Sequence, residues 1–237
     1  MSKHVLLTGS SKGIGKEIAI LLLKQKFKVY GFSRSNSINH QDFIFNKINL
    51  SKPKTIDKLE LPVIKKNEYV FLINNAGDIG EIDRFGNKNN NEIISEFNIN
   101  LVSPTILCNK VIDKYRLKTE NIIIINISSG AALRAIEGWG TYCQSKAAID
   151  MLTSVIKAEN NQKIKVFSIY PGIVDTDMQL KIRSTTEEKF PLQKKFVDYF
   201  QNNELVEPLV VAKKIVHIMT NLNKYQSNMV SLRDLSI

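Results

Sequence analysis

The chain has 237 residues, of which 43% are hydrophobic and 24% are charged, with 11 glycines and 6 prolines. This composition excludes a disordered, a collagen-like or a disulfide-scaffold protein, and the length suits one domain spanning residues 1–237. The net charge of +10 comes from scattered lysines rather than from a basic run, so it predicts a solvated basic surface that attracts anionic cofactors.

Apolar runs and helical patterns alternate along the chain. The apolar runs predict strands at residues 4–8, 27–33, 42–50, 68–77, 121–130, 163–172 and 227–232. Amphipathic patterns predict helices at about 14–26, 52–61, 89–116, 142–160 and 208–221, with an irregular helical stretch at about 176–203. Because the strands are apolar on both faces and alternate with helices, we predict an α/β fold, a doubly wound parallel sheet with helices on both faces.

The segment TGSSKGIG, residues 8–15, follows the first predicted strand and opens the first predicted helix. Its glycines, Gly9, Gly13 and Gly15, allow a tight turn and a close approach of the backbone to a pyrophosphate. The helix that follows points its first N–H groups at anionic oxygens. The segment therefore predicts the dinucleotide site of a Rossmann fold, to which we also assign Ser11 and Ile14.

The end of the second predicted strand distinguishes the two nicotinamide dinucleotides. An NAD site usually has an acidic residue there for a ribose hydroxyl, whereas a basic residue accommodates the 2′-phosphate of NADP. This chain has Ser33 and Arg34 at that point, with no Asp or Glu, and Lys12 in the glycine turn is placed to reach the same phosphate. We therefore predict NADP(H) as the cofactor.

Five motifs occur in the order and spacing of the short-chain dehydrogenase/reductase family, which the chain resembles from about residue 3 to about residue 180. They are TGSSKGIG (8–15), NNAG (74–77), NISS (126–129), YCQSK (142–146) and YPGIVDT (170–176). Within the family, three segments are most similar to benzil reductases of the (S)-benzoin-forming type and to sepiapterin reductases: NISSGAA, GWGTYCQSKAAIDM and PGIVDTDMQ. The resemblance implies an NADPH-dependent carbonyl reductase that reduces a ketone or a 1,2-diketone to a chiral hydroxyl product.

The resemblance also implies roles for the matched residues. Tyr142 resembles the proton donor and Lys146 its partner, Ser129 lies 13 positions before Tyr142, and Asn100 resembles the fourth member of the catalytic tetrad. Further cofactor contacts are implied for Asn74, Asn75, Ala76, Gly77, Tyr142, Lys146, Pro171, Gly172, Val174 and Thr176. The third strand ends in Asn49 and Leu50, where the family often has an Asp that contacts adenine, and we assign these two residues to that place.

Tyr142 and Lys146 lie four positions apart, so they share one face of the predicted helix. A free tyrosine has a pKa of about 10, too high for efficient proton exchange near neutrality. We expect the Lys146 ammonium and the charge of an oxidised nicotinamide to favour the phenolate and lower the pKa of Tyr142. In reduction Tyr142 protonates the substrate oxygen, Ser129 hydrogen-bonds it, and Asn100 fixes a water that resupplies the proton.

The substrate side is less defined. Trp139 is either an aromatic wall for the substrate or packing at the start of the helix, and both interpretations stay open. Met178 begins a lid-like segment after Thr176, and we assign it to the substrate site with Ser129, Trp139 and Tyr142. Sepiapterin reductases anchor their pterin with a C-terminal Asp, and in this chain the tail SLRDLSI offers Asp234.

Several alternatives stay open beside the benzil-type reductase. The enzymatic ones are a sepiapterin-type reductase and a 3-oxoacyl-carrier-protein reductase, whose acidic carrier would dock on the basic surface. The non-enzymatic alternative is an NADP-sensing or nucleic-acid-binding protein, which need not keep Tyr, Lys, Ser and Asn together. The leading hypothesis has a small-molecule carbonyl substrate and neither a nucleic-acid partner nor a membrane partner.

The remaining residue types limit metal chemistry and location. His4, His40 and His217 form no ligand-spaced cluster, so we propose no metal site. Cys108 and Cys143 are too few for a disulfide framework, and the N-terminus has no signal-peptide pattern, so we expect a cytoplasmic protein. The resemblance implies a homodimer or a homotetramer, because members of the family pair through their long helices.

Overall fold

The computed structural model describes residues 2–66, 68–119, 121–160 and 164–236. Seven strands form one parallel sheet in the order β3-β2-β1-β4-β5-β6-β7, which confirms the predicted α/β fold. The strands are β1 (Lys3–Thr8), β2 (Lys28–Ser33), β3 (Phe43–Lys47), β4 (Tyr69–Asn74), β5 (Ile122–Ile127), β6 (Ile164–Tyr170) and β7 (Met229–Ser231). Residue 163, where the sequence predicts that the sixth strand begins, lies outside the described residues.

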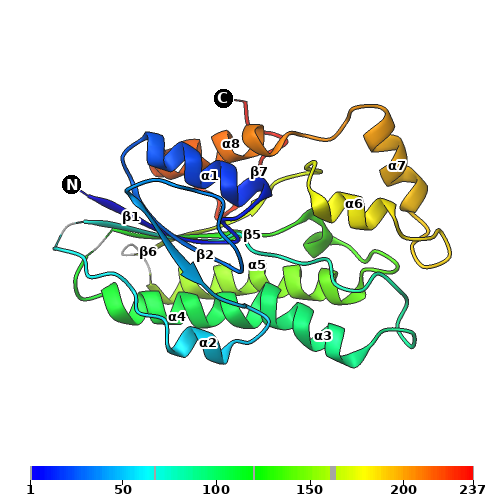
Figure 1. The fold of residues 1–237 in the computed structure, drawn as a ribbon, viewed down its shortest axis with the longest axis horizontal. Coiled ribbons are helices and arrows are strands. Elements are labelled where there is room, and N and C mark those ends of the chain that lie inside the picture. The colour runs from blue at the N-terminus through cyan, green and yellow to red at the C-terminus, as the bar shows by residue number, and fades with distance from the viewer. Residues whose placement is uncertain (1, 67, 120, 161–163, 237) are drawn as a thin grey trace.

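Helices cover both faces of the sheet (Figure 1). One face carries α1 (Gly13–Lys24) and α8 (Pro208–Thr220), and the other carries α4 (Ser103–Tyr115) and α5 (Gly140–Asn160). Side chains alternate along β1, so Val5 and Leu7 belong to one buried apolar cluster while Leu6 belongs to the other. Burial on both sides explains why the strands read as continuous apolar runs rather than alternating ones.

The helix predicted over 89–116 is interrupted. It consists of α3 (Asn90–Phe97), a π-helical segment (Asn98–Val102) and α4. Pro104 has no N–H to give to the carbonyl of Asn100, four residues earlier, so the regular hydrogen-bond ladder breaks there. Single π-helical turns frequently lie at functional sites, and this one holds Asn100 with only 1% of its surface exposed.

The other helices differ from the sequence prediction mainly in length. The weak helix predicted over 52–61 is a single turn, α2 (Lys54–Asp57). The irregular stretch over 176–203 contains two helices, α6 (Asp177–Arg183) and α7 (Gln193–Gln201), which lie together at one end of the molecule (Figure 1). Across the described ranges, no helix is long and apolar enough to cross a membrane.

The strand order positions the site. Since all seven strands are parallel, their carboxyl ends meet at one edge of the sheet, and the order reverses between β1 and β4. In open α/β sheets ligands bind in the crevice at this reversal. A third buried apolar cluster contains Trp139, Tyr142 and Ile182 of α6, and it is separate from the two clusters of the sheet. Met178 of α6 and Phe196 of α7 pack against it.

Candidate functional site

A cavity of about 1070 Å³ opens at the carboxyl ends of the strands and collects most of the residues that the sequence singles out. Three predicted residues are not among those lining it: Asn74, Gly15 and Asn100. The predicted residues that do line it are Gly9, Ser11, Lys12, Gly13, Ile14, Arg34, Asn49, Leu50, Asn75, Ala76, Gly77, Ser129, Trp139, Tyr142, Lys146, Pro171, Gly172, Val174, Thr176 and Met178.

The glycine turn between β1 and α1 has the shape that a pyrophosphate needs. Gly9 has a φ of +69°, which favours glycine, and a Cβ on Gly15 would collide with the carbonyl oxygen of Gly9. The Asn75 side chain donates hydrogen bonds of 3.0 Å to the Thr8 carbonyl and 3.2 Å to the Gly9 carbonyl, which hold the turn against β4. No side chain caps the N-terminus of α1, so its first N–H groups fit an anionic ligand.

The two predicted phosphate-binding cations are placed differently. Arg34 follows β2 and lines the cavity beside Ser33. The Lys12 Nζ lies 2.6 Å from the Asp177 carboxylate in the first turn of α6, so this pair joins the glycine turn to α6. Both side chains are about two-thirds exposed, and such a pair contributes at most about 1 kcal/mol. The ammonium of Lys12 is therefore available to a phosphate at little cost.

Three of the four predicted catalytic residues meet at the cavity floor. The Ser129 hydroxyl, just after β5, lies near enough to the Tyr142 hydroxyl to lower the pKa of Tyr142, and it accepts a hydrogen bond of 3.2 Å from the Ala131 N–H. The Lys146 Nζ lies 5.6 Å from the centroid of the Tyr142 ring and donates a hydrogen bond of 2.8 Å to the Ile127 carbonyl. Both residues of α5 are buried, as a helix face packed on the sheet requires.

Asn100 lies behind this floor. Its side-chain amide donates to the Asp78 carbonyl at 2.8 Å and to the Ser145 hydroxyl at 3.2 Å, and it accepts from the Asp78 N–H at 2.9 Å. A Cβ on Gly77 would lie 3.5 Å from both the Asn100 Oδ1 and the Lys146 Nζ, so these two atoms face the same point. The π-helical segment therefore brings Asn100 next to Lys146, as the resemblance implies.

Residues 3–187 match the sequence profile of the short chain dehydrogenases. This chain belongs to the short-chain dehydrogenase/reductase family. It is 30% identical over 233 residues to a benzil reductase ((S)-benzoin forming) of Bacillus cereus, covering 92% of this chain and 94% of that enzyme. It is 32% identical over 171 residues to a sepiapterin reductase of Bos taurus, covering 71% of this chain and 63% of that enzyme.

A comparison with a solved structure supports the fold. A short-chain dehydrogenase/reductase structure from Saccharomyces cerevisiae superposes with a TM-score of 0.81 at 23% identity, covering 98% of this chain and 97% of that one. The predicted family and enzyme class are thus confirmed, and the chain is an NAD(P)(H)-using oxidoreductase that acts on CH–OH or C=O groups of small molecules.

Burial controls the ionisation of Tyr142 and Lys146 on α5 of this short-chain dehydrogenase. It raises the pKa of Tyr142 to about 12, against the opposing effect of the hydrogen bond with Ser129. It also lowers the pKa of Lys146 to about 8, against the attraction of Asp150 and Glu96. The expectation that Lys146 lowers the pKa of Tyr142 is therefore wrong for the protein chain alone. Desolvation, aided by the negative charges of Glu96 and Asp78, outweighs the hydrogen-bonding effect of Ser129, and the phenol keeps its proton.

Aromatic side chains pack beside Tyr142. Trp139 stacks on Phe190, with ring centroids 5.0 Å apart and planes 7° apart, and meets the Tyr142 ring edge-on at 5.7 Å. It lines the cavity and packs at the start of α5, so packing at the helix start is confirmed, whereas contact with a substrate stays a prediction. Sequence reasoning missed Phe190 and Phe196, because the polar stretch around them shows no regular period.

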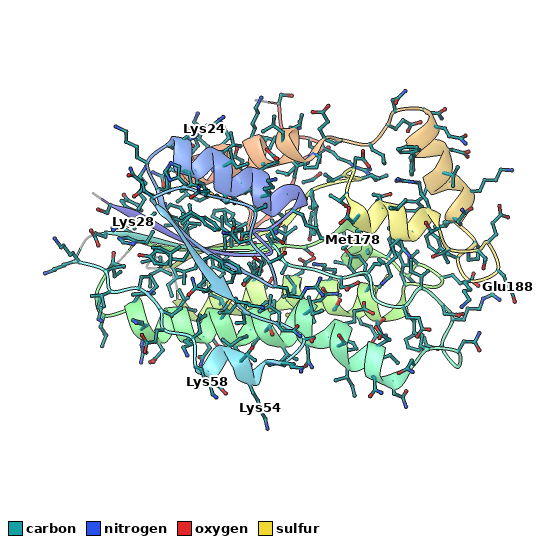
Figure 2. The ribbon with its side chains drawn as sticks, viewed as in Figure 1. Lys24, Lys28, Lys54, Lys58, Met178 and Glu188 are labelled. Carbon is teal, nitrogen blue, oxygen red and sulfur yellow. The ribbon has the colours of Figure 1, made fainter. Side chains whose placement is uncertain are left out.

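The remaining substrate-side residues come from α6 and the C-terminal tail. The Met178 Sδ lies 3.9 Å from the Tyr142 hydroxyl. Met178 is half-buried in the first turn of α6, whereas Lys24, Lys54 and Lys58 project from the surface (Figure 2). Asp234 also lines the cavity. A carboxylate and an apolar thioether thus face the same space from different elements.

Proposed function

We propose that this oxidoreductase is an NADPH-dependent carbonyl reductase. Its substrate is a ketone or a 1,2-diketone of the benzil type, and its product is a chiral alcohol. The observation that carries the proposal is the buried Tyr142 hydroxyl, which keeps its proton, lies near the Ser129 hydroxyl and packs against the Trp139 ring. The similarity to the benzil reductase of Bacillus cereus supports an aromatic substrate.

The residues present fit the cofactor. The glycine turn and the uncapped N-terminus of α1 suit the pyrophosphate. Ser33, Arg34 and Lys12 suit the 2′-phosphate, because β2 does not end in a carboxylate residue. We assign the nicotinamide ribose to Lys146 and the nicotinamide amide to the segment from Pro171 to Thr176. When bound, the cofactor supplies the hydride that reduces the carbonyl carbon.

The protein side chains manage the proton and the developing charge. Tyr142 gives its proton to the carbonyl oxygen as the new C–H bond forms, so the carbonyl becomes a hydroxyl group. Ser129 hydrogen-bonds the same oxygen, and one such preorganised donor stabilises the transition state by about 3 kcal/mol. Lys146 returns a proton to Tyr142, because a pKa of about 8 lets it exchange protons near neutral pH.

The test is NADPH oxidation with benzil, followed by the absorbance of the reduced nicotinamide. Tyr142→Phe should lower kcat at least about 100-fold while the protein still binds NADPH, since the substitution keeps the ring and removes the acid. Tyr69→Phe is the matched control, because Tyr69 is the first residue of β4 and so lies at the amino end of the strands, away from the cavity. Retained activity in Tyr142→Phe would reassign the acid, and no turnover across diketones, quinones and pterins would reject the proposed function.

Cofactor choice has its own test. Arg34→Asp should lower the preference for NADPH over NADH, because the carboxylate repels the 2′-phosphate and accepts a ribose hydroxyl. Arg116→Asp, at the exposed end of α4, is the control. If Arg34→Asp leaves the ratio of the two kcat/KM values unchanged, Arg34 does not contact the cofactor.

A pterin substrate is the second candidate, because one observation favours it. Asp234 lines the cavity, where its carboxylate is placed to accept hydrogen bonds from a pterin ring. This candidate predicts turnover of sepiapterin and a rise of its KM at least tenfold in Asp234→Asn. Turnover of benzil without turnover of sepiapterin would exclude it.

We also propose a homodimer or homotetramer in the cytoplasm. Val102, Met151 and Val155 are exposed apolar residues on the π-helical segment and α5, and a second copy would cover them. Cys108 and Cys143 are free thiols, as a reducing compartment maintains. Light scattering of the purified protein tests the assembly, and a monomer at micromolar concentration would contradict it.

A further inference from the structure

Glu96, in the last turn of α3, is a buried acid outside the catalytic tetrad. Only 2% of its surface is exposed. Its Oε2 accepts a hydrogen bond from the Thr141 hydroxyl in the first turn of α5, and its Oε1 is buried without a hydrogen-bond partner among the described residues. A carboxyl group is costly to bury in this way, so its presence calls for a function.

The loop after β4 closes directly over this carboxyl group. Gly80 has a φ of +64°, and a Cβ there would collide with the Glu96 carboxylate. The same loop contributes Asp78. The Asp78 N–H donates to the Asn100 side-chain oxygen, and the Asp78 carbonyl accepts from the Asn100 side-chain nitrogen. Glu96 is therefore sealed from solvent by the same loop that fixes Asn100.

Two connections run from this acid to the tetrad. Glu96 lies one helical turn before Asn100, and its partner Thr141 directly precedes Tyr142. Asn100 in turn donates to the Ser145 hydroxyl, which donates a 2.9 Å hydrogen bond to the Tyr142 carbonyl. Glu96 and Asn100 thus hold the first turns of α5 at two points, on either side of Tyr142.

The charged groups facing Glu96 come from three other elements. Lys88, before α3, donates to the Glu81 carbonyl and lies 3.4 Å from the Thr141 hydroxyl. Burial, with the charge of Asp78, disfavours the carboxylate and raises the pKa of Glu96 to about 7, although the Thr141 hydrogen bond and the charges of Lys88 and Lys181 of α6 favour it. The negative charge on Glu96 in turn raises the pKa of Tyr142 and supports a higher pKa for Lys146.

We propose that Glu96 is a positioning residue for the catalytic pair. Through Thr141 it fixes the start of α5, and its negative charge holds the proton on Tyr142 and Lys146, so that reduction persists as pH rises. This inference rests on the proposed role of Tyr142 as the proton donor. The charge favours the reductive direction, because reduction needs a protonated tyrosine and a cationic lysine, whereas oxidation of an alcohol needs the phenolate.

The pH profile of kcat for NADPH-dependent reduction tests the proposal. Glu96→Gln keeps an acceptor for Thr141 and removes the charge, so the alkaline limb should move to lower pH by about one pH unit. Glu92→Gln changes an exposed acid one turn earlier on α3 and should leave the profile unchanged. A Glu96→Gln enzyme that is slower at every pH with an unshifted alkaline limb would overturn the charge role.

A titration that needs no turnover separates this inference from the proposed function. The ¹³C signal of the Glu96 carboxyl carbon should titrate near neutral pH, and in Lys146→Met its midpoint should rise, because a nearby cation is lost. The exposed Glu92 signal serves as the internal control. An unmoved Glu96 midpoint would reject the coupling even in an active enzyme. A moved midpoint in a protein that reduces no carbonyl would reject only the proposed function.

Discussion

Lys146→Met should stabilise the folded chain while it abolishes activity. Lys146 is 4% exposed, and burial lowers its pKa from the ordinary 10.5 to about 8. The pKa of Lys146 is thus lowered by about 2.5, and each pKa unit corresponds to about 1.4 kcal/mol. The charged form therefore costs about 3 kcal/mol of folding stability at pH 7. The substitution also leaves the Ile127 carbonyl without its donor, which costs about 1–3 kcal/mol. The expected net gain at pH 7 is thus between about 0 and 2 kcal/mol.

The pH dependence makes this prediction sharp, because the lost hydrogen bond affects every pH equally. The unfolded chain binds the Lys146 proton more tightly than the folded chain, so wild-type stability rises between about pH 8 and pH 10.5. The stability cost of burying the Lys146 charge is complete below that pH window and absent above it. The advantage of Lys146→Met over wild type should therefore shrink by about 3 kcal/mol across the window.

Urea unfolding followed by circular dichroism, at several pH values from neutral to the top of this window, measures the two free energies of unfolding. Lys157→Met, in the last turn of the same helix, replaces an exposed lysine and should show a pH-independent difference from wild type. A constant difference between Lys146→Met and wild type across the window would refute the conclusion that burial, rather than a partner, controls this lysine.

Three further substitutions test the cavity. Gly15→Ala places a Cβ against the Gly9 carbonyl, so we expect at least about tenfold weaker NADPH binding by fluorescence titration, and unchanged affinity would contradict the cradle. Trp139→Ala should cost about 3–5 kcal/mol of stability and lower the kcat/KM ratio of benzil to butanedione, whereas an unchanged ratio would mean that the indole does not touch substrate. Asp177→Asn frees Lys12 and should tighten NADPH binding with less than about 1 kcal/mol change in stability; an unchanged Kd would show that Lys12 stays away from the cofactor.

The sequence predicts the fold well where the chain is most regular. β5 is six consecutive buried residues, and such a run between helices has few solutions other than a central strand of a covered parallel sheet. The least predictable segment is 176–203, because its apolar residues follow no regular spacing. The positions of α6 and α7 depend instead on packing against residues that line the cavity. Phe190 illustrates this: it is fully buried, yet it lies in a polar stretch and packs on Trp139, 51 positions earlier.

Most of the residues that motif spacing by itself predicted do line the candidate site. Strand ends of a parallel sheet meet at one edge, so Gly9, Asn75, Ser129 and Gly172 converge once the strand order is known. Only the tertiary structure decided their ionisation and their second partners. Desolvation is a property of everything packed around a group, so the sequence predicted a lowered Tyr142 pKa and burial reversed it. For the same reason the pairing of Glu96 with Thr141, 45 positions apart, is visible only when the loop above them is in place.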